Sequence, residues 1–218
     1  MAQPSGPTAA LAGVPTGLQS QGLWIGRRQL FLRFAAEAET ATMYTAAAIA
    51  LELKRTAARS VFHSISIGGR DPLQNLEFLG SALAHGPMPL PVMLDVDGQR
   101  PEGVAALTRF LSLAQITLEG PNMEAMVERA MESLKIAADA GVDHCIVLAP
   151  GDQTSDAQML RAVEQVHGVS AKTAIVIHPP VNTPIDRDRR WLTLVERAAP
   201  VHNDVRLFLR LPPPTGTR

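Results

Sequence analysis

Three carboxylates stand at the ends of two successive apolar runs, and their spacing is typical of a metal-binding group. Asp95 and Asp97 lie in the run PVMLDVDG, and Glu119 lies in the following run ITLEG. Carboxylates that converge repel one another unless protons or a cation lie between them, and oxygen-only ligands suit Mg2+ or Mn2+. We therefore predict a divalent metal site at Asp95, Asp97 and Glu119. The alternative is a structural ion network with nearby arginines, or capping of the next helix.

Other polar side chains follow runs of the same kind and are suited to proton transfer or to binding an anion. His178 ends the run IVIHPP and is predicted to move a proton or to act as a fourth ligand, and Glu119 is the second predicted catalytic residue. Six further residues are expected to bind substrate: Arg33, Ser66, Gly69, Arg70, Arg100 and Arg210. These residues predict a metal-assisted lyase or isomerase that acts on a small carboxylated or phosphorylated substrate.

The two carboxylate runs also carry a resemblance to a known family. PVMLDVDG and ITLEG resemble the Asp-x-Asp-x-Gly and Ile-x-x-Glu strand ends of the phosphoenolpyruvate mutase and isocitrate lyase barrels. In that family these carboxylates hold Mg2+, which chelates a 2-oxo acid or its enolate. The resemblance implies that Asp95, Asp97 and Glu119 are metal-site residues. It covers about thirty residues, and the Lys-Lys-Cys-Gly-His loop of the lyases does not occur in this chain.

A strand-helix unit that repeats from about residue 29 is expected to position these side chains. About seven short apolar runs are predicted strands: 29–35, 60–67, 91–97, 114–119, 144–149, 173–178 and 205–211. Helices are expected to open at Asp71-Pro72, at Asn122 and at Ser155 or Asp156, and the second of these to end at Gly141. Such alternation predicts a parallel sheet with right-handed crossovers.

The parity of side chains within the runs favours a TIM-type (βα) barrel. Val92, Leu94 and Val96 share one face of their run, while Met93, Asp95 and Asp97 share the other, and the other runs show the same division. A barrel has one apolar outer face and an inner face that becomes polar at its mouth. The alternative is an open doubly wound parallel sheet, which buries both faces under helices.

A standard barrel has about eight strands, so one strand is missing from this count. The segment GLWIG at residues 22–26 is expected to supply it, or the barrel is incomplete and a partner chain covers its open flank. We expect residues 1–21 to be a flexible N-terminal lead and residues 22–218 to form a single (βα) barrel domain. The incomplete ring also motivates an alternative function, that of a non-catalytic barrel subunit completed by another chain.

Composition excludes several other classes of function. The 20 Lys and Arg residues balance the 21 Asp and Glu residues without a basic run, so nucleic acid is not an expected partner. A single cysteine excludes an internal disulfide and a cysteine-ligated iron-sulfur cluster. No apolar stretch approaches the roughly 20 residues of a membrane span. We expect a cytoplasmic protein, a homo-oligomer or partner subunit, whose ligand is a small anionic metabolite.

Overall fold

The computed structural model describes residues 6–35, 40–121, 123–181, 183–185 and 187–211, and a single ten-stranded sheet organises them. The strands are β1 (Thr8–Gly13), β2 (Thr16–Leu18), β3 (Arg28–Phe34), β4 (Thr42–Thr45), β5 (Ser64–Gly69), β6 (Val92–Val96), β7 (Leu113–Gly120), β8 (Asp143–Pro150), β9 (Ala174–Ile177) and β10 (Val205–Leu207). The helices are α1 (Ala46–Arg59), η1 (Pro72–Asn75), α2 (Leu76–Leu83), α3 (Pro101–Leu107), η2 (Thr108–Phe110), α4 (Met123–Asp139), α5 (Asp156–Val169) and α6 (Arg190–Ala198).

The strand order is β10-β9-β8-β7-β6-β5-β3-β1-β4, with β2 paired to β3. From β3 to β10 along this order, every neighbouring pair is parallel, whereas β1, β2 and β4 pair antiparallel. All of the predicted runs overlap strands of the parallel part. The predicted mixed α/β architecture with a large, mostly parallel sheet is therefore confirmed.

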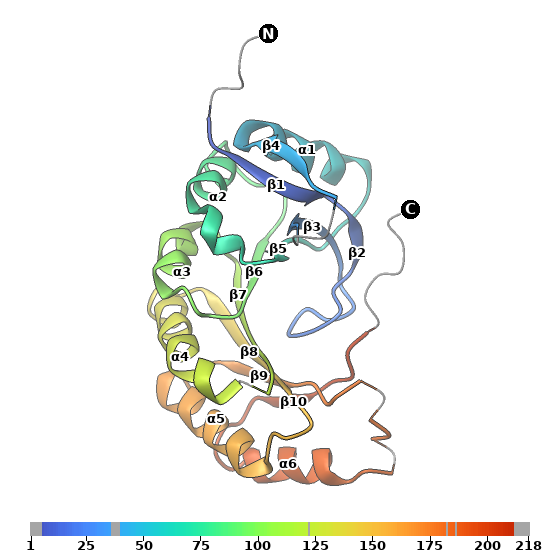
Figure 1. Ribbon diagram of the computed structural model, residues 1–218, viewed down its shortest axis with the longest axis vertical. Helices are drawn as coiled ribbons and strands as arrows, with labels where there is room; N and C mark the ends of the chain where they lie inside the picture. Colours follow the sequence, from blue (N-terminus) through green and yellow to red (C-terminus); the bar gives the residue numbers. More distant parts are fainter. Residues whose placement is uncertain (1–5, 36–39, 122, 182, 186, 212–218) are drawn as a thin grey trace.

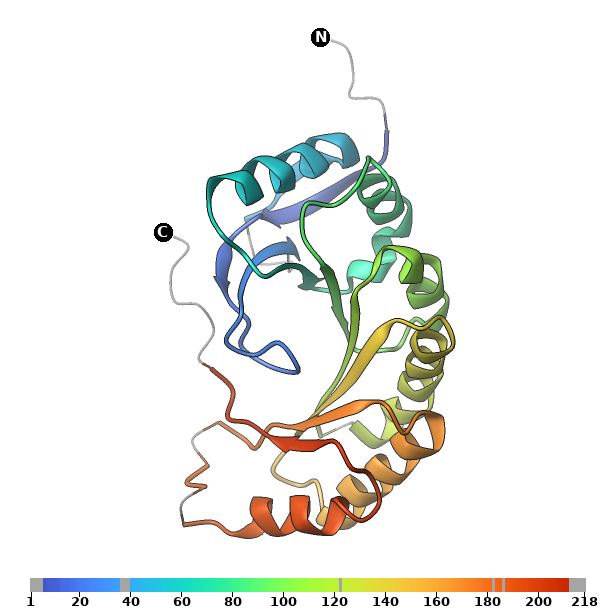
Figure 2. The same ribbon diagram turned by 180° about the vertical axis from the view of Figure 1, so that it is seen from behind.

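The sheet curves into an open arc, and its helices line the outer, convex side (Figures 1 and 2). Within the described residues no strand pairing joins β10 to β4, so the ring does not close. The reason is local: β10 is a three-residue strand, and the β1-β4 pair extends the opposite edge in an antiparallel direction. The doubly wound alternative is not observed either, because the helices cover one face of the sheet.

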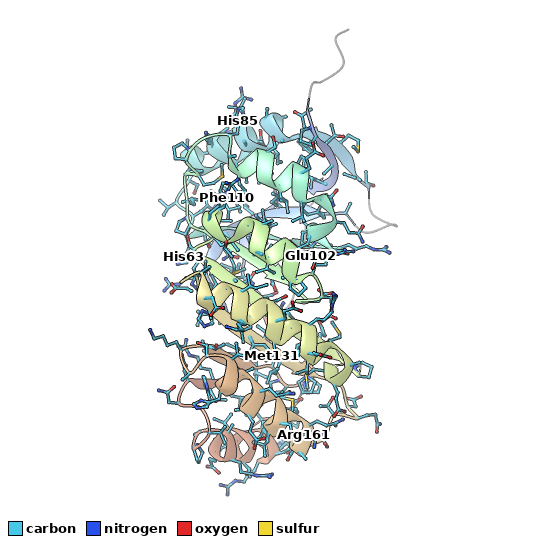
Figure 3. All side chains as sticks on the ribbon, turned by 90° about the vertical axis from the view of Figure 1, so that its left-hand side faces the viewer. His63, His85, Glu102, Phe110, Met131 and Arg161 are labelled. Atoms are coloured by element: carbon cyan, nitrogen blue, oxygen red, sulfur yellow. The ribbon has the colours of Figure 1, made fainter. Side chains whose placement is uncertain are left out.

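The main core lies between the sheet and the helix layer, which Figure 3 shows from outside. The predicted outward side chains, such as Leu94, Ile116 and Ile177, are fully buried in it. Their neighbours Met93 and Cys145 lie instead in a smaller cluster on the concave face. The parity predicted from the sequence is thus confirmed for the central strands. Ser155 caps α5 in a capping box with Gln158, as the pattern predicted, whereas Asn122 lies outside the described residues.

The N-terminal segment differs from the prediction. Residues 8–18 do not form a flexible lead, because they contain β1 and β2, with Ala9 and Leu11 buried in the main core. Residues 22–26 do not form a strand either. They form the turn of the loop between β2 and β3, which the Gln19 N–H closes by donating to the Arg27 carbonyl at 2.8 Å.

This β2–β3 loop (residues 19–27) folds onto the concave face, where Leu23 and Trp24 pack against the small cluster. At Gly22 the backbone of this loop approaches the sheet closely. Gly22 has φ +76°, and a Cβ at this position would lie 1.8 Å from Gln115 Oε1, so only glycine fits without a shift. Among the described helices, none is long and apolar enough to cross a lipid bilayer.

Candidate ligand site at the carboxyl ends of the strands

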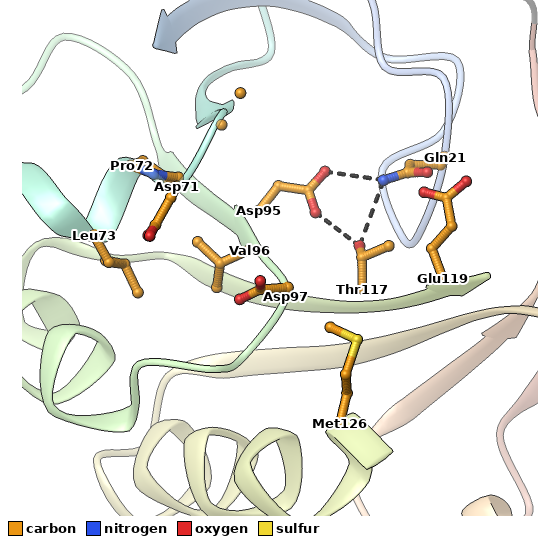
Figure 4. A pocket seen from close by; sticks show the side chains of 12 residues that line it. Gln21, Asp71, Pro72, Leu73, Asp95, Val96, Asp97, Thr117, Glu119 and Met126 are labelled. Atoms are coloured by element: carbon orange, nitrogen blue, oxygen red, sulfur yellow. Dashed lines mark hydrogen bonds between the residues drawn. The ribbon is translucent and has the colours of Figure 1, made fainter. Parts of the chain in front are cut away.

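A cavity of about 280 Å3 lies at the carboxyl ends of β5, β6 and β7, where the sequence predicted a site (Figure 4). Its lining residues are Gln21, Gly68, Gly69, Asp71, Pro72, Leu73, Asp95, Val96, Asp97, Thr117, Glu119 and Met126. Of the predicted site residues, it brings together Gly69, Asp95, Asp97 and Glu119. The β2–β3 loop contributes Gln21, so the cavity is built between the sheet and this loop.

Asp95 is the buried carboxylate of the cavity whose two oxygens both accept hydrogen bonds from neighbouring side chains. Its Oδ1 accepts a hydrogen bond from the Thr117 hydroxyl at 2.8 Å, and its Oδ2 accepts one from Gln21 Nε2 at 3.3 Å. Burial raises the pKa of Asp95, and the hydrogen bond from Thr117 and the nearby amide groups of Gln115, Gln21 and Gln19 oppose this shift. A carboxyl group with a raised pKa in a cavity is a candidate proton donor or acceptor.

The other two predicted metal ligands have separate partners. Asp97 Oδ1 accepts from the Gln99 N–H at 2.9 Å in a tight turn, and Glu119 Oε1 accepts from Arg210 Nη1 at 2.5 Å. Among the described residues no group of three His, Cys, Asp or Glu side chains is placed to hold a metal ion. The side chains do not fit the expected three-carboxylate Mg2+ or Mn2+ site, because local partners draw them apart.

The loop after β5 forms one wall of the cavity. Gly69 has φ +98°, and a Cβ there would lie 2.5 Å from the Phe34 carbonyl oxygen, so this wall requires glycine. Asp71 has φ +37°, which is strained for a residue with a side chain. It makes no capping bond to the following helix, and its carboxylate instead accepts from Arg100 Nε at 2.9 Å and Nη2 at 2.8 Å.

His178 does not line the cavity. The ring is 1% exposed, and its Nε2 accepts from the Gly22 N–H at 2.9 Å. The bonding pattern places the proton on Nδ1, which donates to the Phe208 carbonyl at 2.7 Å. Burial lowers the pKa of His178, and the nearby Arg210 adds to this effect. Because both nitrogens bind main-chain groups, we assign His178 to positioning the β2–β3 loop rather than to proton transfer.

The predicted anion-binding side chains are spread around the rim. Arg33 is exposed on β3, where it pairs in register with Gly68, and Arg70 is exposed beyond the end of β5. Arg100 is engaged by Asp71, and Arg210 by Glu119. Ser66 is buried on β5 and does not line the cavity.

Sequence reasoning missed two residues that hold Asp95. Thr117 shares the inward parity of Glu119, so its position was visible, but a threonine between two charged or amide side chains gave no chemical signal. Gln21 lies in the segment taken for a flexible lead. The glutamines of QSQ at residues 19–21 were the available signal, since amides this close to the first predicted strand are suited to a hydrogen-bonding loop.

Comparisons with known proteins give limited similarity. No family model matches the sequence. The 7-carboxy-7-deazaguanine synthase of Methanothermobacter thermautotrophicus is 23% identical in an alignment of 185 residues that covers 78% of this chain and 70% of that protein. Among solved structures, a truncated form of 3-deoxy-D-arabino-heptulosonate 7-phosphate synthase from Thermotoga maritima matches 77% of this chain and 72% of its own, with a TM-score of 0.38 and 12% identity. The resemblance to phosphoenolpyruvate mutase and isocitrate lyase stays a prediction.

Proposed function

We propose that this protein is an enzyme that binds a small carboxylated nitrogen heterocycle in the cavity and transfers a proton to or from it through Asp95. The reaction class is that of a lyase or isomerase. The observation that carries the proposal is the raised pKa of Asp95 in a cavity at the carboxyl ends of the strands. Among the residues that the structure describes, no three-carboxylate group is placed to hold a metal ion, and the proposed proton transfer uses Asp95.

The character of the lining supports an N–H-rich ligand. Its ionisable side chains are acids, of which Asp71 and Glu119 already pair with arginines. A carboxylate has about four acceptor positions, so Asp95 retains capacity after binding Thr117 and Gln21. Adjacent ring N–H and amino groups of a guanine-like edge are suitable donors for that remaining capacity.

The choice of heterocycle follows from the similarity to a 7-carboxy-7-deazaguanine synthase, whose name specifies a carboxylated guanine-like bicycle. The volume of the cavity is at the lower end of the range for ligand pockets, which suits one fused bicycle. In this arrangement Thr117 and Gln21 orient the carboxyl group of Asp95, and the β2–β3 loop restricts the access of water to it.

Solvent deuterium exchange tests the proposal without knowledge of the full reaction. We expect 7-carboxy-7-deazaguanine, or a reduced analogue with an acidic C–H, to take up deuterium at carbon from D2O in the presence of the protein, as measured by mass spectrometry after the N–H and O–H positions have been exchanged back in H2O. Asp95→Asn should abolish uptake, and Thr117→Val should slow it by about tenfold, the effect of one lost hydrogen bond to a charged group.

The matched control is Asp139→Asn. This carboxylate is exposed on α4, where it pairs with Lys135 at 2.7 Å far from the cavity. It should leave both ligand binding and deuterium uptake unchanged. Equal uptake by wild type and Asp95→Asn would show that Asp95 does not carry the proton.

A second candidate is the non-catalytic subunit that completes its sheet with another chain. The open arc favours it, since Phe208 is 37% and Leu209 53% exposed directly after the edge strand β10. Light scattering after size exclusion distinguishes the two. A stable monomer that exchanges deuterium into ligand contradicts the subunit role, and an inactive chain that gains activity in a larger assembly supports it.

A further inference from the structure

Arg210 presents one edge of its guanidinium group without a partner. Nη1 donates to Glu119, whereas Nε and Nη2 are buried and have no hydrogen-bond partner among the described residues. Nε and Nη2 are the two donors that bind a carboxylate side-on with two parallel hydrogen bonds. Buried donors of a charged group are costly to leave unsatisfied, so this edge is prepared for an acceptor.

The main chain around Arg210 is fixed on both sides. The Phe208 carbonyl accepts from His178 at 2.7 Å, and the Leu211 N–H donates to the Ser20 carbonyl at 3.0 Å. These bonds attach the segment after β10 to β9 and to the β2–β3 loop. Glu119, which lines the cavity, holds the end of the side chain. The guanidinium group is therefore fixed against Glu119, a lining residue of the cavity, before any ligand arrives.

The other buried groups without partners on the concave face are mostly donors as well. Gln19 Nε2 and Gln115 Nε2 share this property with Arg210. Both amides lie close enough to Asp95 to lower its pKa, so they belong to the surroundings of the same cavity. These buried N–H groups have no acceptor among the described residues, so a ligand with acceptor oxygens would satisfy them.

We propose that the Nε–Nη2 edge of Arg210 binds the carboxylate of the substrate, so that the substrate class of this site is planar monocarboxylates. This inference rests on the proposed function of the cavity and assigns the group of the ligand that lies at the Glu119 side of the lining. A phosphate group fits less well, because one fork satisfies two oxygens and the adjacent Glu119 repels a dianion.

Matched ligands test the assignment by calorimetry. Wild type should bind 7-carboxy-7-deazaguanine at least about tenfold more tightly than its carboxamide. This is the ratio of affinities expected from a charge-assisted pair of hydrogen bonds. Arg210→Met should reduce this ratio to about one and leave the affinity for the carboxamide unchanged. Arg210→Lys should recover part of the preference, since it keeps the charge and loses the fork.

The control is Arg161→Lys, an exposed position on α5 paired with Glu124 at 3.1 Å, which should keep the wild-type ratio. An Arg210→Met variant that still prefers the acid overturns the inference. Its fold is checked by circular dichroism, and Arg210→Lys gives the same comparison if the methionine variant does not fold.

A simple carboxylate separates failure of this inference from failure of the proposed function. Benzoate should raise the melting temperature of wild type and not of Arg210→Met, and inorganic phosphate should have a smaller effect than benzoate. If neither bicycle binds but benzoate stabilises through Arg210, the heterocycle is wrong and the carboxylate site stands. Absence of benzoate stabilisation, its persistence in Arg210→Met, or an equal effect of phosphate overturns the Arg210 assignment.

Discussion

Removal of the His178 imidazole is expected to detach the β2–β3 loop from the sheet. The ring accepts a hydrogen bond from the Gly22 N–H and donates one to the Phe208 carbonyl, and His178 is only 1% exposed. A buried main-chain group left without a partner costs about 1–3 kcal/mol. Two such groups give a loss of about 2–6 kcal/mol in the free energy of unfolding for His178→Ala, measured by urea denaturation at neutral pH.

Two conservative variants separate the two hydrogen bonds. His178→Asn keeps a donor near the position of Nδ1, and His178→Gln keeps an acceptor near that of Nε2, so each should cost about half as much as alanine. Hydrogen exchange should accelerate at the Gly22 amide in the alanine and asparagine variants and stay slow in the glutamine variant. A loss below about 0.5 kcal/mol in His178→Ala, no more than a typical surface substitution, or an unchanged Gly22 amide would refute the reasoning. His85→Ala, at an exposed position, is the control.

The same site predicts a pH dependence with a defined sign. Burial lowers the pKa of His178 below its ordinary value of 6.5. Between the lowered pKa and 6.5 the unfolded chain binds more protons than the folded protein, so stability rises with pH across this window. The stability is fully present above 6.5 and is lost as the pH falls through the folded-state pKa. His178→Gln should remove this part of the slope.

Three further results are expected. Asp95→Asn should stabilise the ligand-free protein at neutral pH and weaken the loss of stability as the pH rises above about 3.9, because burial raises the pKa of Asp95. The same dependence of the free energy of unfolding on pH in wild type and variant, measured by urea denaturation, contradicts this. Gly22→Ala should cost about 2 kcal/mol in urea denaturation, since its backbone conformation and contact with Gln115 both exclude a side chain; wild-type stability disproves it. Millimolar MgCl2 should not shift the melting temperature, and a shift that Asp95→Ala abolishes would restore the three-carboxylate site.

The central part of the fold could be predicted because its determinants are local. In a strand, side chains alternate between faces, so Leu94 and Ile116 were assigned to the helix side and Asp95 and Thr117 to the other face from spacing alone. The end of a parallel strand also defines the edge at which its last polar residue emerges. This reasoning placed Asp95 and Glu119 at the cavity that the structure contains.

The remainder depends on contacts that local pattern does not encode. β1 (TAALAG) and β4 (TMYT) are short strands without a β-branched apolar run, and their pairing joins Thr8 to Thr45, so their periodicity was too weak to recognise. Closure of the ring depends on whether distant edges meet. The partners of the predicted metal ligands could not be predicted for a similar reason, because the choice between a shared cation and a separate partner for Asp97 and Glu119 depends on the turn at Gln99 and the path of Arg210.

The arrangement of the apolar layers determines which positions of this sequence can diverge in evolution without loss of the fold. The aliphatic residues that stabilise the sheet face the helices, and the ligand cavity draws instead on the opposite face and on the β2–β3 loop. Substitutions of loop and strand-end residues that line the cavity therefore alter ligand preference while the aliphatic layer under the helices is unchanged. Gly22, Leu23 and Trp24 hold the β2–β3 loop on the sheet, so laboratory evolution of new specificity should begin at Gln21, which lines the cavity.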